Sequence, residues 1–338
     1  MKLKITLLIG LIAAAAVLAA ACRPGATPEA KPYKETQFLM DTIVEMTAYG
    51  PDAENAVKAA FAEIKRLHGI SDNFDPASQV SKINQAAGRA KVKADPDLIA
   101  MMLRANELAD KLEGTFDVTV GPLTELWGIG RKGDFVPAQE DIDRVLPLVN
   151  YRLVAIDAAA GTVYLPKEGM KLDLGGIAKG YAVDKAIAIL KSRGVSSALV
   201  NAGGDVRVIG KRPDGNPWRI GVQHPRNPDA IIAKLSLTDW DTMETSGDYQ
   251  RYIMKDGVRF SHVLDPRTGR QPRGLASVTV ALNNSADGDI FSTALLILGP
   301  ERGLELLRQF PGVEAIMVAA DGKVTLSPGL EGKAEIEK

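Results

Sequence analysis

The strongest hydrophobic signal in the chain is a run of almost unbroken apolar residues over positions 5–21. Lys2 and Lys4 precede this run, and a polar, proline-rich stretch follows it. A basic start, a short apolar segment and small residues at its end are the pattern of a secretory signal. The run is also slightly shorter than the about 20 apolar residues that a spanning helix needs. The pattern therefore predicts a signal peptide over residues 1–21.

Beyond position 37 the hydrophobic pattern alternates between helical and extended periods. Apolar residues three and four apart predict helices, and short runs rich in β-branched residues predict strands. Helices are expected from Pro51-Asp52 to near Gly69, from Asp95-Pro96 to Gly114, from Gly175-Gly176 to Gly194, and over 286–298 and 300–310. Strands are expected at 42–49, 198–201, 206–209, 218–222, 234–237, 252–254 and 277–282, with hairpins over 151–165 and around Asp321-Gly322.

The order of these elements decides the fold class. Helices and strands alternate without the regular strand–helix–strand repeat of a doubly wound sheet, which favours an α+β fold of mixed sheets with packed helices. Residues 38–338 have the length and apolar content of one large domain, here expected to consist of two lobes. Residues 22–37 are expected to form a polar, proline-rich stalk that carries the lipid at its start and leads into this domain after the signal peptide is removed.

Composition and charge exclude one class of function. The chain carries 41 basic and 42 acidic residues, and no basic stripe or arginine-rich helix stands out. A protein that binds nucleic acid concentrates positive charge on one face or along one helix. No nucleic-acid partner is therefore expected.

Cys22 is the only cysteine in the sequence, and it stands directly after Leu18-Ala19-Ala20-Ala21. Small residues before a lone cysteine resemble a bacterial lipobox, in which the cysteine is acylated and becomes the mature N-terminus. The leucine lies four positions before Cys22, whereas the usual lipobox has it at three. The resemblance implies an exported lipoprotein anchored to a membrane and facing the periplasm or the cell exterior. The alternative is an ordinary cleavage site beside a cysteine of no consequence, and in either case no intramolecular disulfide can form.

The first candidate for chemistry is the segment 171–184, where Asp173 and the pair Gly175-Gly176 precede a helix that carries Lys179. Free N–H groups at a helix start, close to a glycine pair, form a binding site for an anion. Lys179 would face a phosphate there. The alternative is a plain strand-to-helix turn, and the glycines of 201–205 allow the same two interpretations.

The second candidate is His262, which lies between a serine and an apolar pair in the segment 261–269, downstream of the polar segment 244–249. A functional histidine and a buried structural one are equally compatible with this local pattern. The other two histidines, His68 and His224, are interpreted as structural or surface residues.

The third candidate is the predicted helix that contains Asp289 and Thr293. Residues four apart lie on one helix face. A carboxylate and a hydroxyl are hard oxygen donors that suit Mg²⁺ and not zinc. The alternative is an acidic residue near a helix N-terminus together with a threonine in the core.

Taken in order, these segments resemble the ApbE family, the FAD:protein FMN transferases. The resemblance starts at Met40-Asp41-Thr42, similar to the Met-Gly-Thr of the family but with aspartate in the place of glycine. It continues through the segments 74–84, 114–123, 171–184, 201–205, 245–249, 261–269 and 289–293. Each segment alone is a weak signal, and their combination carries the resemblance, which implies an ApbE-like (T-fold-like) fold.

The resemblance also implies an activity and the residues that perform it. Such enzymes bind FAD, cleave its pyrophosphate with Mg²⁺, attach FMN to a threonine hydroxyl and release AMP. Asp289 and His262 would be catalytic, with His262 accepting the threonine proton or orienting the pyrophosphate. The metal would be held by Gly176, Asp289, Ser292 and Thr293. FAD would contact Met40, Phe74, Thr115, Phe116, Asp117, Asp173, Lys179 and Val263, with Phe74 replacing a frequent tyrosine.

The implied protein partners are membrane or exported electron-transfer subunits that carry a Ser/Thr-Gly-Ala-Thr-like motif. Two other functions remain compatible with the same residues. One is an FAD pyrophosphatase, in which water replaces threonine and free FMN and AMP are released. The other is a non-catalytic lipoprotein that only binds FAD.

Overall fold

The structure is a computed structural model that describes residues 31–337. The predicted signal peptide and Cys22 lie outside the described residues. The largest element is an eight-stranded antiparallel sheet in the order β1-β2-β6-β7-β10-β13-β14-β15. Its strands are β1 (Tyr33–Leu39), β2 (Thr42–Tyr49), β6 (Ser197–Ala202), β7 (Asp205–Ile209), β10 (Thr242–Gly247), β13 (Leu275–Leu282), β14 (Glu314–Ala319) and β15 (Val324–Leu326).

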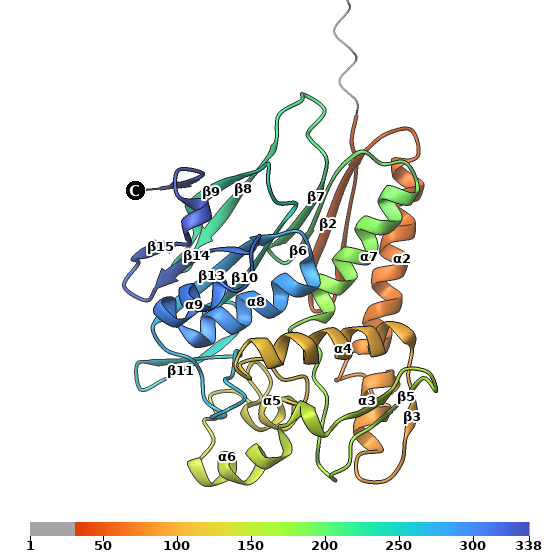
Figure 1. Ribbon diagram of the computed structural model, residues 1–338, viewed down its shortest axis with the longest axis vertical. Helices are drawn as coiled ribbons and strands as arrows, with labels where there is room; N and C mark the ends of the chain where they lie inside the picture. Colours follow the sequence, from red (N-terminus) through yellow and green to blue (C-terminus); the bar gives the residue numbers. More distant parts are fainter. Residues whose placement is uncertain (1–30, 338) are drawn as a thin grey trace, which may run out of the picture.

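Helices cover one face of this sheet, as Figure 1 shows. Helices α2 (Ala53–Ser71) and α7 (Ala178–Ser192) pack on each other and on β2 and β6 through a shared apolar core. Helix α8 (Ser285–Leu298) covers β10 and β13, and α9 (Pro300–Leu307) follows it. Within the described chain, no helix is both long and apolar enough to cross a membrane.

The opposite face of the sheet is covered by a second, three-stranded sheet of β8 (Trp218–His224), β9 (Asn227–Leu237) and β16 (Ala334–Ile336). Apolar side chains of this second sheet, among them Trp218 and Leu235, pack on Met243 and Val318 of the large sheet. Because both faces of β10 and β13 are covered, β13 is buried at every position.

A second group of elements lies at one end of the molecule, below the sheet in Figure 1. It contains α4 (Pro96–Lys111) and the short helices α3 (Gln79–Gln85), α5 (Gly121–Trp127) and α6 (Gln139–Val145). It also contains a small sheet of β3 (Val92–Lys93), β5 (Thr162–Tyr164) and β4 (Ala155–Asp157). A two-stranded hairpin of β11 (Tyr252–Lys255) and β12 (Val258–Ser261) is attached to this end, and its Phe260 packs on Trp127.

The predicted α+β class is confirmed, and the predicted long helices and most strands are present. The sequence did not predict five of the strands, namely β1, β3, β10, β12 and β16. Strand β1 starts at Tyr33, inside the segment that was expected to be a stalk up to residue 37, because Tyr33–Leu39 pairs with β2 along its whole length. Strand β10 was missed, since its polar sequence Thr-Met-Glu-Thr-Ser-Gly lacks an apolar period and becomes extended only through pairing with β7 and β13.

Helices α7 and α8 approach so closely that one position between them admits only glycine. A Cβ atom on Gly180 would lie 2.1 Å from the carbonyl oxygen of Ser285. Two hydrogen bonds stabilise this contact between the helices. The Asp184 carboxylate of α7 accepts the N–H groups of Ser285 and Ala286 at 2.9 and 3.0 Å. A carboxylate at a helix N-terminus stabilises that end of the helix. This contact holds α8 in register with α7 and therefore Asp289 beside Lys179.

Replacing Gly180 by alanine is expected to destabilise the fold by about 1–3 kcal/mol, as overpacking of a closed contact does. The matched control is Gly69→Ala on α2, where a Cβ would meet nothing within 4 Å. Alanine there is expected to be neutral or stabilising by up to about 1 kcal/mol through helix propensity. Thermal unfolding of both variants checks this, and equal midpoints would contradict a tight α7–α8 contact.

Candidate active site

One cavity of about 500 Å³ opens where the large sheet meets the lower group of elements. Small-molecule sites commonly measure about 300–1,000 Å³. The cavity is lined by every predicted cofactor, metal and catalytic residue of the domain except Ser292. These are Met40, Phe74, Thr115, Phe116, Asp117, Asp173, Gly176, Lys179, His262, Val263, Asp289 and Thr293. The structure thus brings together residues that are up to about 250 positions apart in the sequence, with the far ones supplied by α8.

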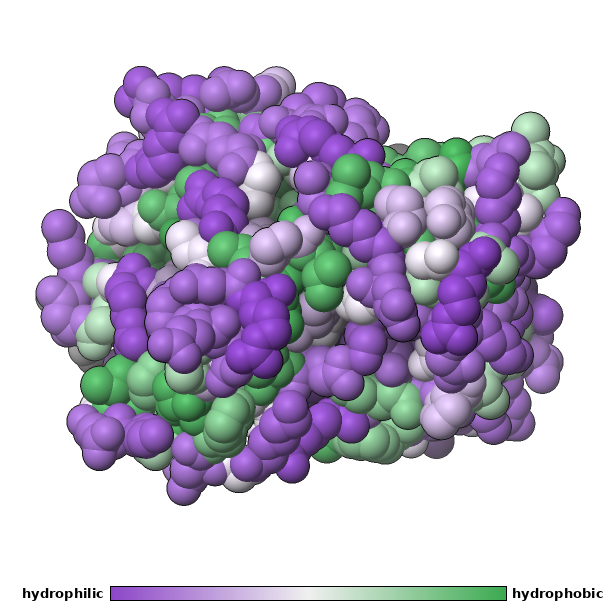
Figure 2. Space-filling model, turned by 90° about the horizontal axis from the view of Figure 1, so that it is seen from below, coloured by the Kyte–Doolittle hydropathy of each residue, from purple (hydrophilic) through white to green (hydrophobic). Residues whose placement is uncertain are grey.

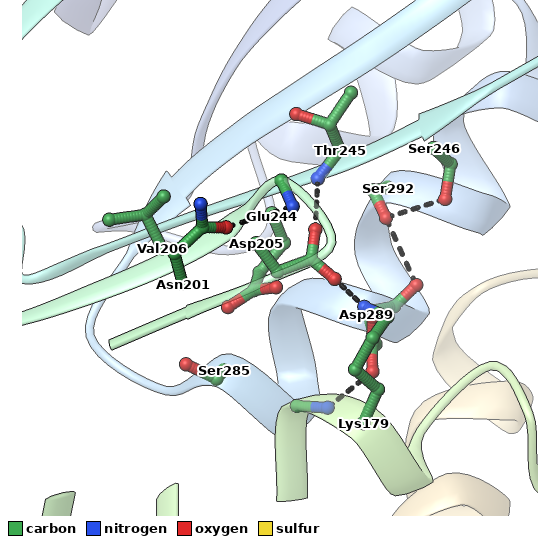
Figure 3. Close-up of polar contacts among 12 residues, drawn as sticks. Lys179, Asn201, Asp205, Val206, Glu244, Thr245, Ser246, Ser285, Asp289 and Ser292 are labelled. Atoms are coloured by element: carbon green, nitrogen blue, oxygen red, sulfur yellow. Dashed lines mark hydrogen bonds and ion pairs between the residues drawn. The ribbon is translucent and has the colours of Figure 1, made fainter. Parts of the chain in front are cut away.

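The floor of the cavity holds an ion-pair cluster around Lys179 (Figure 3). The Lys179 ammonium pairs with Asp205 and lies 2.8 Å from Oδ1 of Asp289. The second oxygen of Asp289 accepts the N–H of Gly180 at 2.6 Å. Asp205 is held in turn by the N–H of Thr245, which donates to its Oδ1 at 2.9 Å. Two nearly buried carboxylates therefore fix one ammonium at the cavity wall.

A third carboxyl, that of Glu244, completes the cluster from β10. It is fully buried, and one oxygen of each of Asp205, Glu244 and Asp289 lies within 4.8 Å of the others. Desolvation is the main cause that raises the pKa of Glu244, while the nearby Lys179 opposes it and the Asp289 charge adds to it. Its Oε1 accepts the Thr242 hydroxyl at 2.7 Å. The cation that this cluster holds in the structure is the Lys179 ammonium.

Hydroxyl groups form a second polar group beside Asp289. The Ser246 hydroxyl lies 3.2 Å from that of Thr293, which lines the cavity, and 2.9 Å from that of Ser292. Ser292 is 1% exposed and also donates to the backbone carbonyl of Asp289 at 3.1 Å. Its hydroxyl therefore lies behind the cavity wall, where it orients Ser246. Beside Lys179 the cavity lining thus carries oxygens of Asp289, Thr293 and Ser246, and carboxylate and hydroxyl oxygens are a hard donor set that fits Mg²⁺.

Two aspartates that line the cavity use their carboxylates to shape its wall. Asp173 accepts the N–H of Gly175 and the hydroxyl of Thr124, both at 2.9 Å. Asp117 accepts the Thr119 N–H at 2.7 Å and the Tyr151 N–H at 3.0 Å, and desolvation raises its pKa despite these bonds. Gly176, next to this wall, lies against Phe116: a Cβ there would come within 2.7 Å of the ring.

His262 lines the cavity directly after the last residue of β12. Its Nδ1 is 3.3 Å from the carbonyl oxygen of Arg251, and a carbonyl can only accept. This contact therefore favours the tautomer with a proton on Nδ1, which leaves Nε2 as an acceptor. Desolvation, reinforced by the charges of Arg251 and Lys179, lowers the pKa of His262 to about 4. The imidazole is neutral at pH 7.

The rim of the cavity is formed by Met40, Asp41 and Phe74 with two arginines, Arg131 and Arg251. Met40 and Asp41 both have a left-handed backbone, with φ of 54° and 56°. Glycine adopts this conformation without strain. This explains why the Met-Gly-Thr motif that Met40-Asp41-Thr42 resembles has glycine at the position of Asp41. The carboxylate of Asp41 lies 4.0 Å from Arg131 and 3.9 Å from Arg251, and the Arg131 guanidinium covers the ring of Phe74 at 3.2 Å.

Several residues of the site were missing from the sequence-based assignment. His68 was interpreted as structural or surface; it lines the cavity, and its Nδ1 accepts the Met40 N–H at 3.4 Å. Asp205 and Ser246 lie inside the segments 201–205 and 245–249 that carried the resemblance, and Glu244 directly precedes the second of them, so those segments were their only signal. The two rim arginines lie in loops with no recognisable pattern.

Comparisons with known proteins identify the family. The model of the ApbE family matches residues 40–317. The FAD:protein FMN transferase of Klebsiella pneumoniae (strain 342) is 36% identical over 297 residues, which cover 87% of this chain and 92% of that protein. The FAD:protein FMN transferase of Treponema pallidum (strain Nichols) is 31% identical over 331 residues, with coverages of 92% and 91%.

Solved structures give the same result. The crystal structure of the ApbE protein from Thermotoga maritima superposes with a TM-score of 0.83 at 33% identity, covering 90% of this chain and 99% of that one. The apo form of the flavinyl transferase ApbE from Pseudomonas stutzeri superposes at 0.80 and 31% identity, with coverages of 90% and 97%. Fold and site together define an enzyme of the flavin transferase class. The chain belongs to the ApbE family.

Proposed function

We propose that this enzyme transfers FMN from FAD to a threonine hydroxyl of an acceptor protein and releases AMP. The observation that carries the proposal is the convergence of Lys179, Asp289 and His262 on one cavity. A pyrophosphate needs neutralising charge, and a hydroxyl nucleophile needs an acceptor for its proton. The cavity wall offers the Lys179 ammonium, which it shares with Asp205 and Asp289, and the imidazole of His262 within a volume suited to a small molecule. The transferase names of the relatives support the same assignment.

In the proposed reaction the threonine oxygen attacks the phosphorus of the FMN half of FAD. A new P–O bond forms to the threonine, the bond from that phosphorus to the bridging oxygen breaks, and AMP leaves with the bridging oxygen. The threonine proton passes to Nε2 of His262, which its tautomer leaves free. Lys179 binds the pyrophosphate oxygens, and its anchoring by Asp205 keeps the ammonium in place while phosphate charge builds up.

We propose Mg²⁺ as the cofactor, held by the side chains of Asp289 and Thr293 and by the Gly176 carbonyl. The donor set supports this choice, since carboxylate, hydroxyl and carbonyl oxygens are the ligands that Mg²⁺ prefers. When bound, Mg²⁺ would neutralise charge on the pyrophosphate. Ser246 is added to the predicted set as a polar neighbour of Thr293 at 3.2 Å. Ser292 supports Ser246 in this arrangement.

The test incubates the purified protein with FAD, Mg²⁺ and an acceptor that carries a Ser/Thr-Gly-Ala-Thr-like motif. Intact-protein mass spectrometry is expected to show the mass gain of one FMN on the acceptor, with one AMP released for each FMN attached. Free FMN and AMP without labelled acceptor would replace the transferase by an FAD pyrophosphatase. Bound FAD with neither product would identify a non-catalytic flavin-binding protein.

We further propose that Cys22 is acylated and anchors the enzyme to a membrane, facing the periplasm or the cell exterior. The lipobox-like Leu18-Ala19-Ala20-Ala21 and the absence of any other cysteine in the sequence support this. An anchor raises the effective concentration of enzyme near acceptors held at the same surface. Those acceptors are expected to be membrane or exported electron-transfer subunits.

Replacing Cys22 by serine is expected to move the protein from the membrane fraction of the producing cells to the soluble exported fraction. Metabolic labelling with a palmitate analogue measures the lipid directly. A wild-type protein that is soluble and unlabelled would remove the anchor from the proposal and leave the flavin chemistry intact.

A further inference from the structure

The hairpin of β11 and β12 joins the candidate active site directly. Among residues 31–337, β11 pairs only with β12, so one of its edges is open. The pairing continues one step beyond the strands, where the His262 N–H donates to the Arg251 carbonyl at 2.9 Å. Arg251 and His262, which both line the cavity, are therefore the next pair in the hairpin register. Figure 1 shows β11 at the margin of the molecule.

The register determines which main-chain groups point away from the hairpin. Opposite residues of an antiparallel pair alternate between bonding each other and facing outward. Because Arg251 and His262 bond each other, the next pair, Tyr252 and Ser261, faces outward, and so does the pair of Met254 and Arg259. On the β12 side the outward orientation is confirmed by two hydrogen bonds. The Ser261 carbonyl accepts the Gln271 side chain at 3.2 Å, and the Arg259 carbonyl accepts the Arg273 side chain at 3.1 Å.

On the β11 side the outward groups are the N–H and C=O of Tyr252 and Met254. None of these groups hydrogen-bonds to another residue in the part of the chain that the structure describes. The two side chains are also exposed, Tyr252 by 41% and Met254 by 47%. Seen from below, the apolar surface residues are scattered among polar ones and form no single apolar face (Figure 2). The distinctive feature of β11 is its open hydrogen-bonding edge.

We propose that the open edge of β11 binds the acceptor protein as an added, extended strand. This inference rests on the proposed function, which requires a polypeptide acceptor at the cavity. Strand addition obtains affinity from main-chain hydrogen bonds and specificity from alternate side chains. An extended segment paired with Met254 and Tyr252 continues past Arg251 with a rise of about 3.3 Å per residue. Its next residues reach the cavity mouth, where His262 lies.

The charge around the hairpin indicates the chemistry of this segment. Residues 251–261 carry Arg251, Lys255 and Arg259 against the single acidic residue Asp256. Arg251 and Arg259 pair with Asp41 and Asp248 outside the hairpin, but each of these acids is shared with a second arginine, so positive charge stays in excess. An excess of positive charge attracts a partner of the opposite sign and speeds the encounter. The added strand is therefore an extended segment with acidic flanking residues, followed by the threonine that accepts FMN.

The proposal is tested with Met254→Pro, which removes one outward N–H and no bond of the hairpin. Proline is tolerated in an edge strand where its nitrogen faces solvent. The matched control is Met254→Ala, which removes the side chain and keeps the N–H. We expect Met254→Pro to raise the KM for the acceptor protein about tenfold or more, and Met254→Ala to change it by less than threefold. The affinity for FAD is expected to stay the same in both.

A second measurement uses acceptor peptides and the unmodified enzyme, so that it is independent of how the variants fold. Peptides N-methylated at one position each, along the segment before the threonine, are compared by their rate of labelling. Strand addition predicts a loss at every second position, because only alternate N–H groups of a strand face its neighbour.

The outcomes separate the two proposals. If the wild-type enzyme labels no acceptor, the proposed function fails. If it labels the acceptor, but Met254→Pro leaves the acceptor KM unchanged and the methylated peptides show no period of two, the function stands and docking on β11 is wrong.

Discussion

Asp289→Asn is expected to lower the rate of FMN transfer by roughly 10²–10³-fold, the size of loss that follows removal of one preorganised electrostatic group. The carboxylate of Asp289 is the charged member of the proposed metal set and the partner of Lys179 at 2.8 Å. Asparagine keeps the shape and an oxygen for the Gly180 N–H, which Asp289 accepts at 2.6 Å. The change therefore tests the negative charge and leaves the contact between α7 and α8 in place.

Three measurements define this result: the rate of covalent labelling, the release of AMP, and Mg²⁺ binding by calorimetry. We expect both rates to fall together and Mg²⁺ to bind at least tenfold more weakly. The control is Asp287→Asn, two residues earlier on the same helix, where the carboxylate pairs with Arg104 at 2.6 Å outside the cavity. Wild-type Mg²⁺ affinity and rates in Asp289→Asn would show that the metal assignment is wrong.

His262→Gln is expected to slow transfer by roughly 10²–10⁴-fold, the usual contribution of a general base. Glutamine can still donate to the Arg251 carbonyl, but its side chain cannot take up the threonine proton. FAD binding should change by less than about threefold, since the flavin and pyrophosphate contacts remain. His224→Gln, at the end of β8 and not among the residues that line the cavity, serves as the control. A raised KM for FAD with unchanged kcat would instead assign His262 to orienting the pyrophosphate.

The pH dependence follows from the lowered pKa of His262. A free histidine has a pKa of about 6.5, whereas burial lowers the pKa of His262 to about 4. The base form is therefore present above pH 4 and is lost as the pH falls through that value. The acidic limb of kcat/KM, which reports the free enzyme, is expected near pH 4 to 5. A limb near pH 6.5 would indicate a solvated imidazole.

The sequence by itself determined the local elements and the family. Strand β2 was predicted at about 42–49, the bounds that the structure has, because alternating apolar and polar residues indicate a strand directly. Helix α4 was located by its cap, since Asp95 accepts the Asp97 N–H and Pro96 opens the helix. The pair Asp289 and Thr293 was placed on one helix face by spacing alone. These features depend on neighbours within one or two turns, so they are visible in the order of residues.

Only the tertiary structure decided how the distant segments meet. Strand β10 has no apolar period of its own, and it places Glu244 and Ser246 because β7 and β13 hold it between them. Lys179 was predicted to face a phosphate, but its pairing with Asp205 depends on contacts between α7 and the large sheet. Ser292, one position from Thr293, has its hydroxyl behind the cavity wall, because a helix turns neighbouring side chains by about 100°. Sequence spacing shows which residues share an element, and only packing shows which of them share a cavity.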